Sequence, residues 1–396
     1  MEENIAYFNT NNGTGKFFGG ERERLVITSN ANDPLGQLQS FINKNKGEHI
    51  VVALSYDLKN SLETLKSTNR DSIEFPQILA WIPELGVDIG DELNLDQLPD
   101  AYRSTLEELS TKSSVETPSR SIKFRPTISR DSYLEHVEEL KECIQQGTIY
   151  EVNFCQEYLA DKVNIDQPIS YYKQLNNITK APFSCFLKFD EFQVYSGSPE
   201  RYISREGNRL ISEPIKGTRP RSSSREEDER LKEELKSDPK ERSENVMIVD
   251  LVRNDFSRIA KKGSVKVDEL FGIYSFETVH QMISRIACEV DEMIDFKAII
   301  QATFPMGSMT GAPKISAMKL IEMHESFRRG LYSGTVGYFE PNGDFSLNVM
   351  IRSIIHNSRK RIASCSVGSA ITIQSDAKKE YDECQVKIRK IIEEMK

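Results

Sequence analysis

Short apolar runs alternate with amphipathic stretches along the chain, and this pattern predicts a mixed α/β protein. Runs such as Leu25–Ile27, Ile50–Leu54 and Ile78–Trp81 have the length and composition of buried strands. Stretches with apolar residues at helical spacing separate such runs. Apolar and polar residues alternate through residues 331–373, which is typical of strands. We therefore expect a fold in which helices cover β-sheet structure.

One amphipathic stretch, Asp238–Asp255, places acidic residues on its apolar face. Asp238 is a favourable N-cap, and Pro239 suits the first helical position. At about 100° per residue, one face carries Glu241, Glu244, Met247, Ile248, Leu251 and Val252. Burying ionised carboxylates is unfavourable unless a cation or hydrogen bonds compensate. The pair is therefore either two first-turn acids that interact with the helix dipole or half of a metal site.

The last predicted helix repeats the pattern. Glu380 and Glu383 begin it beside an apolar stripe, and Lys387 continues the same edge at the next helical position. Carboxylate oxygens from two helix N-termini suit Mg²⁺, and no histidine cluster nearby favours zinc. Spacing alone leaves a magnesium site and two unrelated helix starts as alternatives.

Residues 200–216 predict a β-hairpin with Gly207-Asn208 at its turn. In that register Glu200 faces Lys216. The pair is either a cross-strand surface ion pair, which contributes little stability, or part of a site built on rigid strand ends. The glycine-rich segment 307–314 lacks the spacing of a nucleotide-binding P-loop, although its backbone N–H groups suit a carboxylate.

Composition limits the function classes. The 396 residues are 38% hydrophobic and 29% charged, which is typical of a soluble globular protein, and no apolar run is long enough to cross a membrane. The net charge of −9 argues against nucleic acid as the main ligand. The six cysteines form no CxxC pair, which suggests a reduced, cytoplasmic protein. The Ser/Thr-rich segment 106–126 is the best linker candidate.

Nine segments in the same order resemble the chorismate-utilising enzymes, which include aminodeoxychorismate, anthranilate, isochorismate and salicylate synthases. They are S-P-E-R (198–201), P-I-K-G-T-R-P (214–220), the helix 238–255, T-V-H (278–280), G-S-M-T-G-A-P-K (307–314), R-G-L-Y-S-G-T-V-G-Y (329–338), I-R-S (351–353), S-V-G-S-A-I (366–371) and E-Y-D-E-C-Q-V-K (380–387). The resemblance implies an α/β (α+β) fold of two packed antiparallel β-sheets with helices outside. It also implies an N-terminal α/β region (1–120) intertwined with a chorismate-binding catalytic domain (121–396).

The resemblance further implies a Mg²⁺-dependent site for chorismate. Glu244 and Glu383 correspond to the metal ligands, and Glu241 and Glu380 support them. Glu200 corresponds to the general acid that helps the C4 hydroxyl leave. The residues implied to bind substrate are His280, Ser308, Tyr332, Arg352, Gly368 and Lys387.

Lys216 separates branches of the family, because aminodeoxychorismate synthases carry P-I-K-G-T where anthranilate synthases have Ala in place of Lys. The lysine is implied to attack the ring at C2 before ammonia enters at C4. A nucleophilic amine must be neutral, so we expect the pKa of Lys216 to lie below its usual value of about 10.4. Glu151 stands where isochorismate and salicylate synthases have a water-activating lysine, so water addition is disfavoured; the role of Glu151 is left open.

The resemblance therefore predicts the large subunit of an aminodeoxychorismate synthase, which forms 4-amino-4-deoxychorismate from chorismate and ammonia for 4-aminobenzoate and folate synthesis. No cysteine lies in a G-x-C-x-G motif, so ammonia is expected from solution or from a separate glutamine amidotransferase subunit. The alternatives are an anthranilate synthase component and an inactive paralogue that binds chorismate or an amidotransferase.

Overall fold

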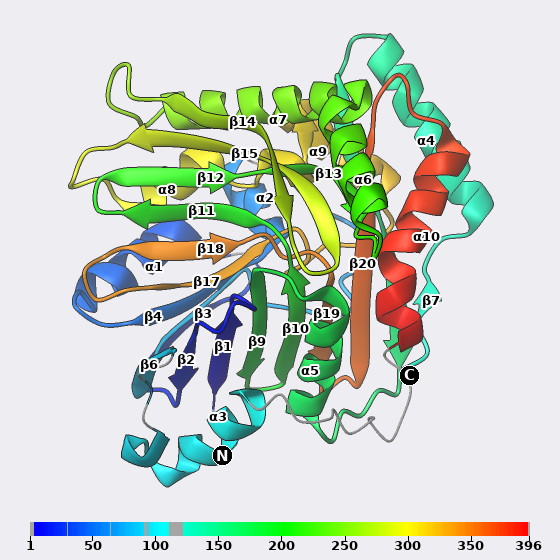
Figure 1. Cartoon of the computed structure of the whole chain (residues 1–396). Coiled ribbons are helices and arrows are strands. Elements are labelled where there is room, and N and C mark those ends of the chain that lie inside the picture. Colours follow the sequence, from blue (N-terminus) through cyan, green and yellow to red (C-terminus); the bar gives the residue numbers. More distant parts are fainter. Residues whose placement is uncertain are drawn as a thin grey trace.

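The computed structural model describes residues 4–29, 31–63, 65–90, 93, 95–110 and 122–394. Two ten-stranded β-sheets pack against each other, and helices cover their outer sides (Figure 1). The paired strands within both sheets are antiparallel, as in the β8–β20 and β4–β17 ladders. The predicted fold class is confirmed.

The first sheet has the strand order β16-β8-β20-β19-β10-β9-β1-β2-β6, and β7 pairs with β8. Its strands are Ile5–Asn9 (β1), Gly15–Gly19 (β2), Leu85–Ile89 (β6), Arg125–Pro126 (β7), Glu151–Asp161 (β8), Phe183–Phe189 (β9), Phe192–Ser198 (β10), Gly311–Ala312 (β16), Ser353–Asn357 (β19) and Ile362–Ile371 (β20).

The second sheet has the order β13-β15-β12-β11-β18-β17-β4-β5-β3, and β14 pairs with β15. Its strands are Glu23–Ile27 (β3), Ile50–Leu54 (β4), Ile78–Ile82 (β5), Arg201–Glu206 (β11), Arg209–Glu213 (β12), Ile215–Pro220 (β13), Lys266–Ser275 (β14), Val279–Glu289 (β15), Thr335–Phe339 (β17) and Phe345–Asn348 (β18). Strands from the first 90 residues belong to both sheets. The proposed boundary at residue 120 falls outside the described residues and stays a prediction, as does most of the predicted linker.

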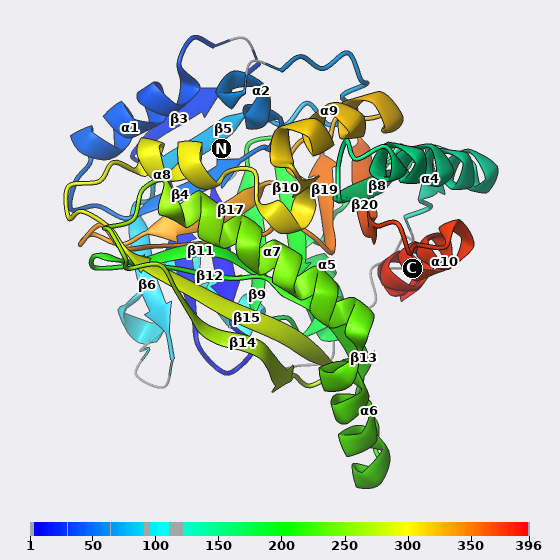
Figure 2. The ribbon, with the colours of Figure 1, turned by 90° about the horizontal axis from the view of Figure 1, so that it is seen from above.

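Ten α-helices lie within the described residues. They are Pro34–Lys44 (α1), Lys59–Leu62 (α2), Asp100–Ser110 (α3), Arg130–Gln145 (α4), Pro168–Thr179 (α5), Arg225–Ser237 (α6), Pro239–Ser257 (α7), Phe296–Thr303 (α8), Lys314–His324 (α9) and Ala377–Glu394 (α10). Seen from above, α4, α9 and α10 lie on the same side of the first sheet as one another (Figure 2). None of the helices in the described part of the chain is both long enough and apolar enough to span a membrane.

Two hydrophobic cores hold these layers together. The larger lies between the sheets, where Trp81 of β5 packs on Phe189 of β9 with ring centroids 5.2 Å apart. The second lies between the outer face of the first sheet and the helices, where Tyr133 of α4 packs on Phe154 of β8 at 5.1 Å. Burial of such large rings stabilises both cores.

Local boundaries differ from the sequence predictions in informative ways. Asp238 caps α7 as predicted and accepts hydrogen bonds from the backbone N–H groups of Lys240 and Glu241. Helix α4 begins at Arg130, and the side chain of Ser129 caps it by accepting a hydrogen bond from the backbone N–H of Ser132. The predicted hairpin forms as β11 and β12 but ends at Glu213, so Lys216 lies on the next strand, β13, which pairs with β15.

Candidate active site

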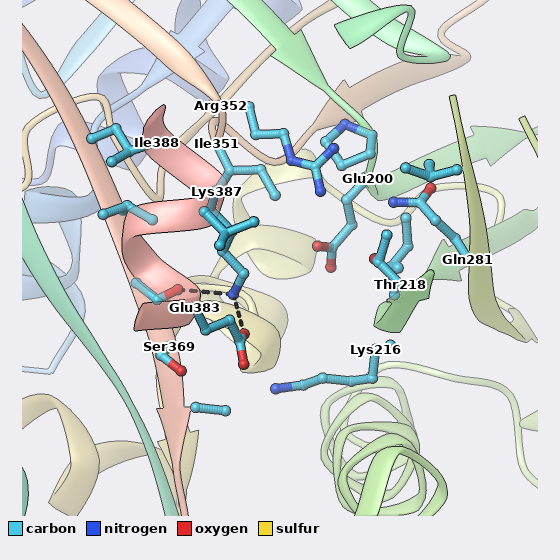
Figure 3. Close-up of a pocket in the computed structure, with 18 of the residues that line it drawn as sticks. Glu200, Lys216, Thr218, Gln281, Ile351, Arg352, Ser369, Glu383, Lys387 and Ile388 are labelled. Carbon is cyan, nitrogen blue, oxygen red and sulfur yellow. Dashed lines mark hydrogen bonds and ion pairs between the residues drawn. The ribbon is translucent and has the colours of Figure 1, made fainter. Parts of the chain in front are cut away.

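A cavity of about 670 Å³ opens where the ends of both sheets meet α7 and α10. The connection between β10 and β11, strand β13, the first turn of α7, the turn at residues 307–309, strand β20 and α10 contribute its walls. Figure 3 shows acidic and basic side chains from opposite walls pointing toward one another across it. Charged groups from segments far apart in sequence therefore converge in one place.

Eleven of the twelve predicted site residues line this cavity. They are Glu200, Lys216, Glu241, Glu244, Ser308, Tyr332, Arg352, Gly368, Glu380, Glu383 and Lys387. Because these residues line one cavity, the sequence motifs that carry them belong to a single site.

His280 is the exception, and the prediction that it lines the ring site is corrected. Neighbouring residues on a strand point to opposite faces, and on β15 Val279 and Gln281 are the ones that line the cavity. The buried His280 ring instead contacts Ser275 Oγ through Nδ1 at 2.8 Å and Asp228 Oδ1 through Nε2 at 3.0 Å. The histidine therefore ties β15 to α6.

The ammonium group of Lys216 sits among carboxylates. Its Nζ lies 2.9 Å from Glu151 Oε1 and 4.0 Å from Glu244 Oε2. Burial alone would lower the pKa of Lys216, but Glu151, Glu244 and Glu200 outweigh burial and raise that pKa above its usual value. The expectation of a lowered pKa is therefore wrong, and the amine must give up a proton before it can act as a nucleophile.

Glu151 reaches Lys216 because β8 is held close to the glycine-rich turn. Strand β16 pairs with β8 through Gly311 opposite Val152 and Ala312 opposite Glu151. Gly311 has φ +148°, and a Cβ there would clash with the carbonyl oxygen of Glu151. The turn that superficially suggests a phosphate loop thus serves a close backbone approach that positions Glu151.

Glu200 is a buried carboxyl group beside the lysine. Burial raises its pKa to about 7, although a hydrogen bond with Ser308 and the charge of Lys216 act in the opposite direction. A carboxyl group with this pKa both holds and releases a proton near neutral pH, which is the property needed in a general acid.

The four carboxylates of α7 and α10 face the cavity and are balanced by nearby cations. Lys240 Nζ lies 3.7 Å from Glu244 Oε1 and 3.2 Å from Glu380 Oε1. Burial raises the pKa of Glu244 to about 7. Burial also acts to raise the pKa of Glu383, but Lys387, 2.7 Å away, helps hold it below its usual value. The acids on the helix faces are thus compensated in part by lysines.

The four carboxylates of α7 and α10 do not form a four-ligand metal cage. Among the described residues, the four carboxylate groups do not bring three ligand atoms within 4.8 Å of one another. Mg²⁺ is commonly bound by one or two carboxylates together with water and substrate oxygens. Glu244 Oε1 is buried without a hydrogen-bond partner, so it is an acceptor available to a cation. The donor chemistry therefore fits Mg²⁺ at Glu244 and Glu383.

Arg352 supplies positive charge on the opposite wall. Its backbone has φ +51°, a left-handed conformation uncommon for a non-glycine residue, and its side chain points into the cavity (Figure 3). Burial lowers the pKa of Arg352, whereas Glu200 raises it. A guanidinium group in this position is suited to bind a carboxylate through two parallel hydrogen bonds.

Sequence reasoning missed three contributors to the site. The sequence indicates no role for Glu151. Arg219 follows Lys216 within the same motif, and Lys240 follows Pro239 at the start of α7. Arg219 contacts Asp238 at 2.7 Å and Glu241 at 3.5 Å. The acidic residues on the apolar helix faces do indicate that cations must lie close to them. Their spacing in the sequence does not identify which lysines or arginines these are.

Taken with the fold, this site defines an enzyme that binds a small carboxylated substrate between two antiparallel sheets. The family model for chorismate binding enzymes matches residues 3–393. The chain therefore belongs to the chorismate-binding enzyme family.

Individual relatives differ in name, and they include aminodeoxychorismate synthases and anthranilate synthases. The chain is 34% identical over 347 residues to aminodeoxychorismate synthase component 1 of Bacillus subtilis, covering 83% of this chain and 73% of that protein. It is 36% identical over 260 residues to anthranilate synthase component 1 of Aquifex aeolicus, covering 66% of this chain and 52% of that protein. The crystal structure of anthranilate synthase component I from Streptococcus pneumoniae matches with a TM-score of 0.80 and 25% identity, covering 97% and 92% of the two chains.

Proposed function

We propose that this chain is the chorismate-aminating subunit of an aminodeoxychorismate synthase, which replaces the C4 hydroxyl group of chorismate with an amine. The observation that carries the proposal is Lys216, placed in the cavity between Glu151 and Glu244. The relative from Bacillus subtilis, named aminodeoxychorismate synthase component 1, supports the same activity.

Substrate binding follows from the charges of the cavity. Chorismate carries two carboxylates, and Arg352 with Tyr332 is suited to hold one of them. Glu244 and Glu383 would hold Mg²⁺, which supplies a positive charge for the other carboxylate. The lining residues Ser308 and Gly368 complete the ring site.

The reaction requires proton transfers that the cavity residues can make. Lys216 gives its proton to Glu151, and the neutral amine forms a bond to C2 as both ring double bonds shift toward C4 and the C4 hydroxyl leaves. Glu200 donates the proton that converts this hydroxyl to water. Ammonia then bonds to C4, both double bonds shift back and the C2–N bond to Lys216 breaks. The new C4 ammonium group gives a proton to Glu200, and Glu151 returns its proton to the Lys216 amine. The balance is chorismate plus ammonia giving 4-amino-4-deoxychorismate plus water.

Ammonia comes, in this proposal, from a separate glutamine amidotransferase subunit, and the product feeds 4-aminobenzoate and folate synthesis. Purified chain, chorismate, Mg²⁺ and an ammonium salt are the components of the test, with mass spectrometry of the products. The expected product retains the enolpyruvyl group and carries one amine in place of one hydroxyl.

Anthranilate synthase is the second candidate, because relatives with that name match in sequence and in fold. The same assay separates the two activities. Formation of anthranilate and pyruvate would refute the proposed C4 amination and favour this alternative.

A further inference from the structure

A second cluster of metal-ligating side chains lies outside the active-site cavity. His136 and Glu139 occupy neighbouring turns of one face of α4, and His324 is the last residue of α9. None of the three lines the active-site cavity. The two helices lie on the same side of the first sheet (Figure 2), so residues 188 positions apart in the chain meet there.

Three donor atoms of this cluster form a nearly equilateral triangle. Glu139 Oε2 lies 3.2 Å from His136 Nδ1 and 3.2 Å from His324 Nδ1. The two Nδ1 atoms are 3.3 Å apart. The edges of the triangle are therefore equal to within 0.1 Å.

Hydrogen bonds cannot form between all three pairs of donor atoms at once. A neutral imidazole nitrogen is either a donor or an acceptor, and a carboxylate oxygen only accepts. If both Nδ1 atoms carry hydrogen, two N–H groups oppose each other. If one does not, its lone pair faces the lone pairs of Glu139. A cation at the centre of the three lone pairs resolves this conflict.

The triangle has the dimensions of one face of a tetrahedral zinc site. Zinc binds imidazole nitrogen and carboxylate oxygen at about 2.0–2.1 Å, which gives a tetrahedral edge of about 3.3–3.4 Å. We infer that His136, Glu139 and His324 form a binding site for Zn²⁺ or a chemically similar transition-metal ion, with the fourth position open to water. Imidazole ligands distinguish this site from the carboxylate pair proposed for Mg²⁺.

The surroundings suit this role. His324 is largely buried at the end of α9, with 14% of its side chain exposed. His136 is held by an edge-to-face contact with Phe154 of β8, with ring centroids 5.9 Å apart. Glu139 is half exposed, which leaves the ion an entry path from solvent.

Metal binding would join two helices that support the active site. Helix α9 follows directly from the turn that contributes Ser308 to the cavity, and α4 packs against α10, which carries Glu383. The ion would thereby fix the end of α9 to α4. Because the metal binds only the folded arrangement, it should also raise the melting temperature.

The test uses the full-length chain, stripped with a chelator and kept in excess Mg²⁺ so that the active-site carboxylates are occupied. Zn²⁺ affinity is measured by competition with a chromophoric chelator, and Co²⁺ reports coordination geometry by its visible spectrum. We expect one equivalent of tetrahedral ion. His136→Gln, His324→Gln and Glu139→Gln should each weaken binding at least about tenfold.

His49→Gln is the matched control, because His49 also faces a carboxylate, Glu340 at 3.4 Å, and belongs to no group of three ligands in the described part of the chain. It should bind Zn²⁺ as the unmodified protein does. Glu139→Gln changes a half-exposed side chain and keeps the assay informative if a histidine variant fails to fold. No binding by the unmodified protein, an octahedral Co²⁺ spectrum, or an equal loss in His49→Gln would overturn the inference.

Discussion

Replacing Glu151 with glutamine tests whether it takes the proton of Lys216 or only holds the ammonium group. The two groups are 2.9 Å apart, and Glu244 is 4.0 Å from the same Nζ. At an effective dielectric constant of about 20, these pairs interact by about 6 and about 4 kcal/mol. Glu151→Gln therefore removes the stronger attraction while the charge of Glu244 still holds Lys216 in the cavity.

The two roles predict opposite effects on the rate. If Glu151 only stabilises the ammonium form, its removal lowers the pKa of Lys216 and speeds covalent attack. If Glu151 is the base, attack slows by about 10²–10⁴-fold. We expect covalent attack to slow in Glu151→Gln. The difference in rate should become smaller as the pH rises, because hydroxide then deprotonates Lys216.

Adduct formation is measured by rapid quenching with chorismate and Mg²⁺, in the absence of ammonia, followed by mass spectrometry of the intact protein over a range of pH. Glu157→Gln is the matched control: Glu157 lies on the same strand, is also buried, and accepts a hydrogen bond from Ser364 Oγ rather than from Lys216. It should leave the rate within a few fold of the unmodified enzyme. An adduct rate in Glu151→Gln at or above that of the unmodified enzyme at neutral pH would refute the assignment of the base.

Three further predictions concern the same cavity. Glu244→Gln should abolish Mg²⁺-dependent turnover, yet thermal melts should show a free energy of unfolding that is higher by up to about 3 kcal/mol at about pH 8. Burial raises the pKa of Glu244 from 4.5 in the unfolded chain to about 7 in the folded protein, so the stability present below pH 4.5 is lost as the pH rises through about 7. Turnover should fall as pH rises through about 7 while Glu200 loses its proton, and Glu200→Gln should remove this dependence; an unchanged pH profile would exclude Glu200 as the acid. Gly311→Ala should lower the free energy of unfolding, measured by chemical denaturation, by about 3 kcal/mol or more, because its Cβ would clash with the backbone of Glu151. Gly343→Ala, at an open turn, should lower it by less.

The sequence was most informative where chemistry and periodicity coincide. The N-cap at Asp238 and the two Glu-x-x-Glu helix starts are local features, and the structure places all four glutamates around one cavity. The buried face of α7 is nevertheless rotated slightly from the predicted one, since Asn245 and Val249 are buried while Met247 and Leu251 are only partly so. Packing against β13 and β15 decides this rotation, and a single helix's periodicity does not contain that information.

The two incorrect predictions concern properties that depend on contacts between residues far apart in the sequence. The requirement for a neutral nucleophile predicts a lowered pKa for Lys216, but it takes no account of the charge of Glu151, which is 65 positions away in the chain. His280 was assigned to the cavity from its motif, but the direction of its side chain depends on the pairing of β15 with β13 and β14. Register and long-range ion pairs follow from the assembled sheets, which explains why motifs located the site better than they oriented its members.

The charges lining the cavity favour binding of the metal and the substrate together. The lining includes the carboxylates of Glu200, Glu241, Glu244, Glu380 and Glu383 and the cations of Lys216, Arg219, Lys240, Arg352, Lys387 and Lys390. These charges nearly cancel, so a dicarboxylate alone would leave the site negative, and a divalent ion alone would leave it strongly positive. Binding both returns the site to its starting charge. The proposed function therefore requires that Mg²⁺ and chorismate each raise the affinity for the other, by the same factor.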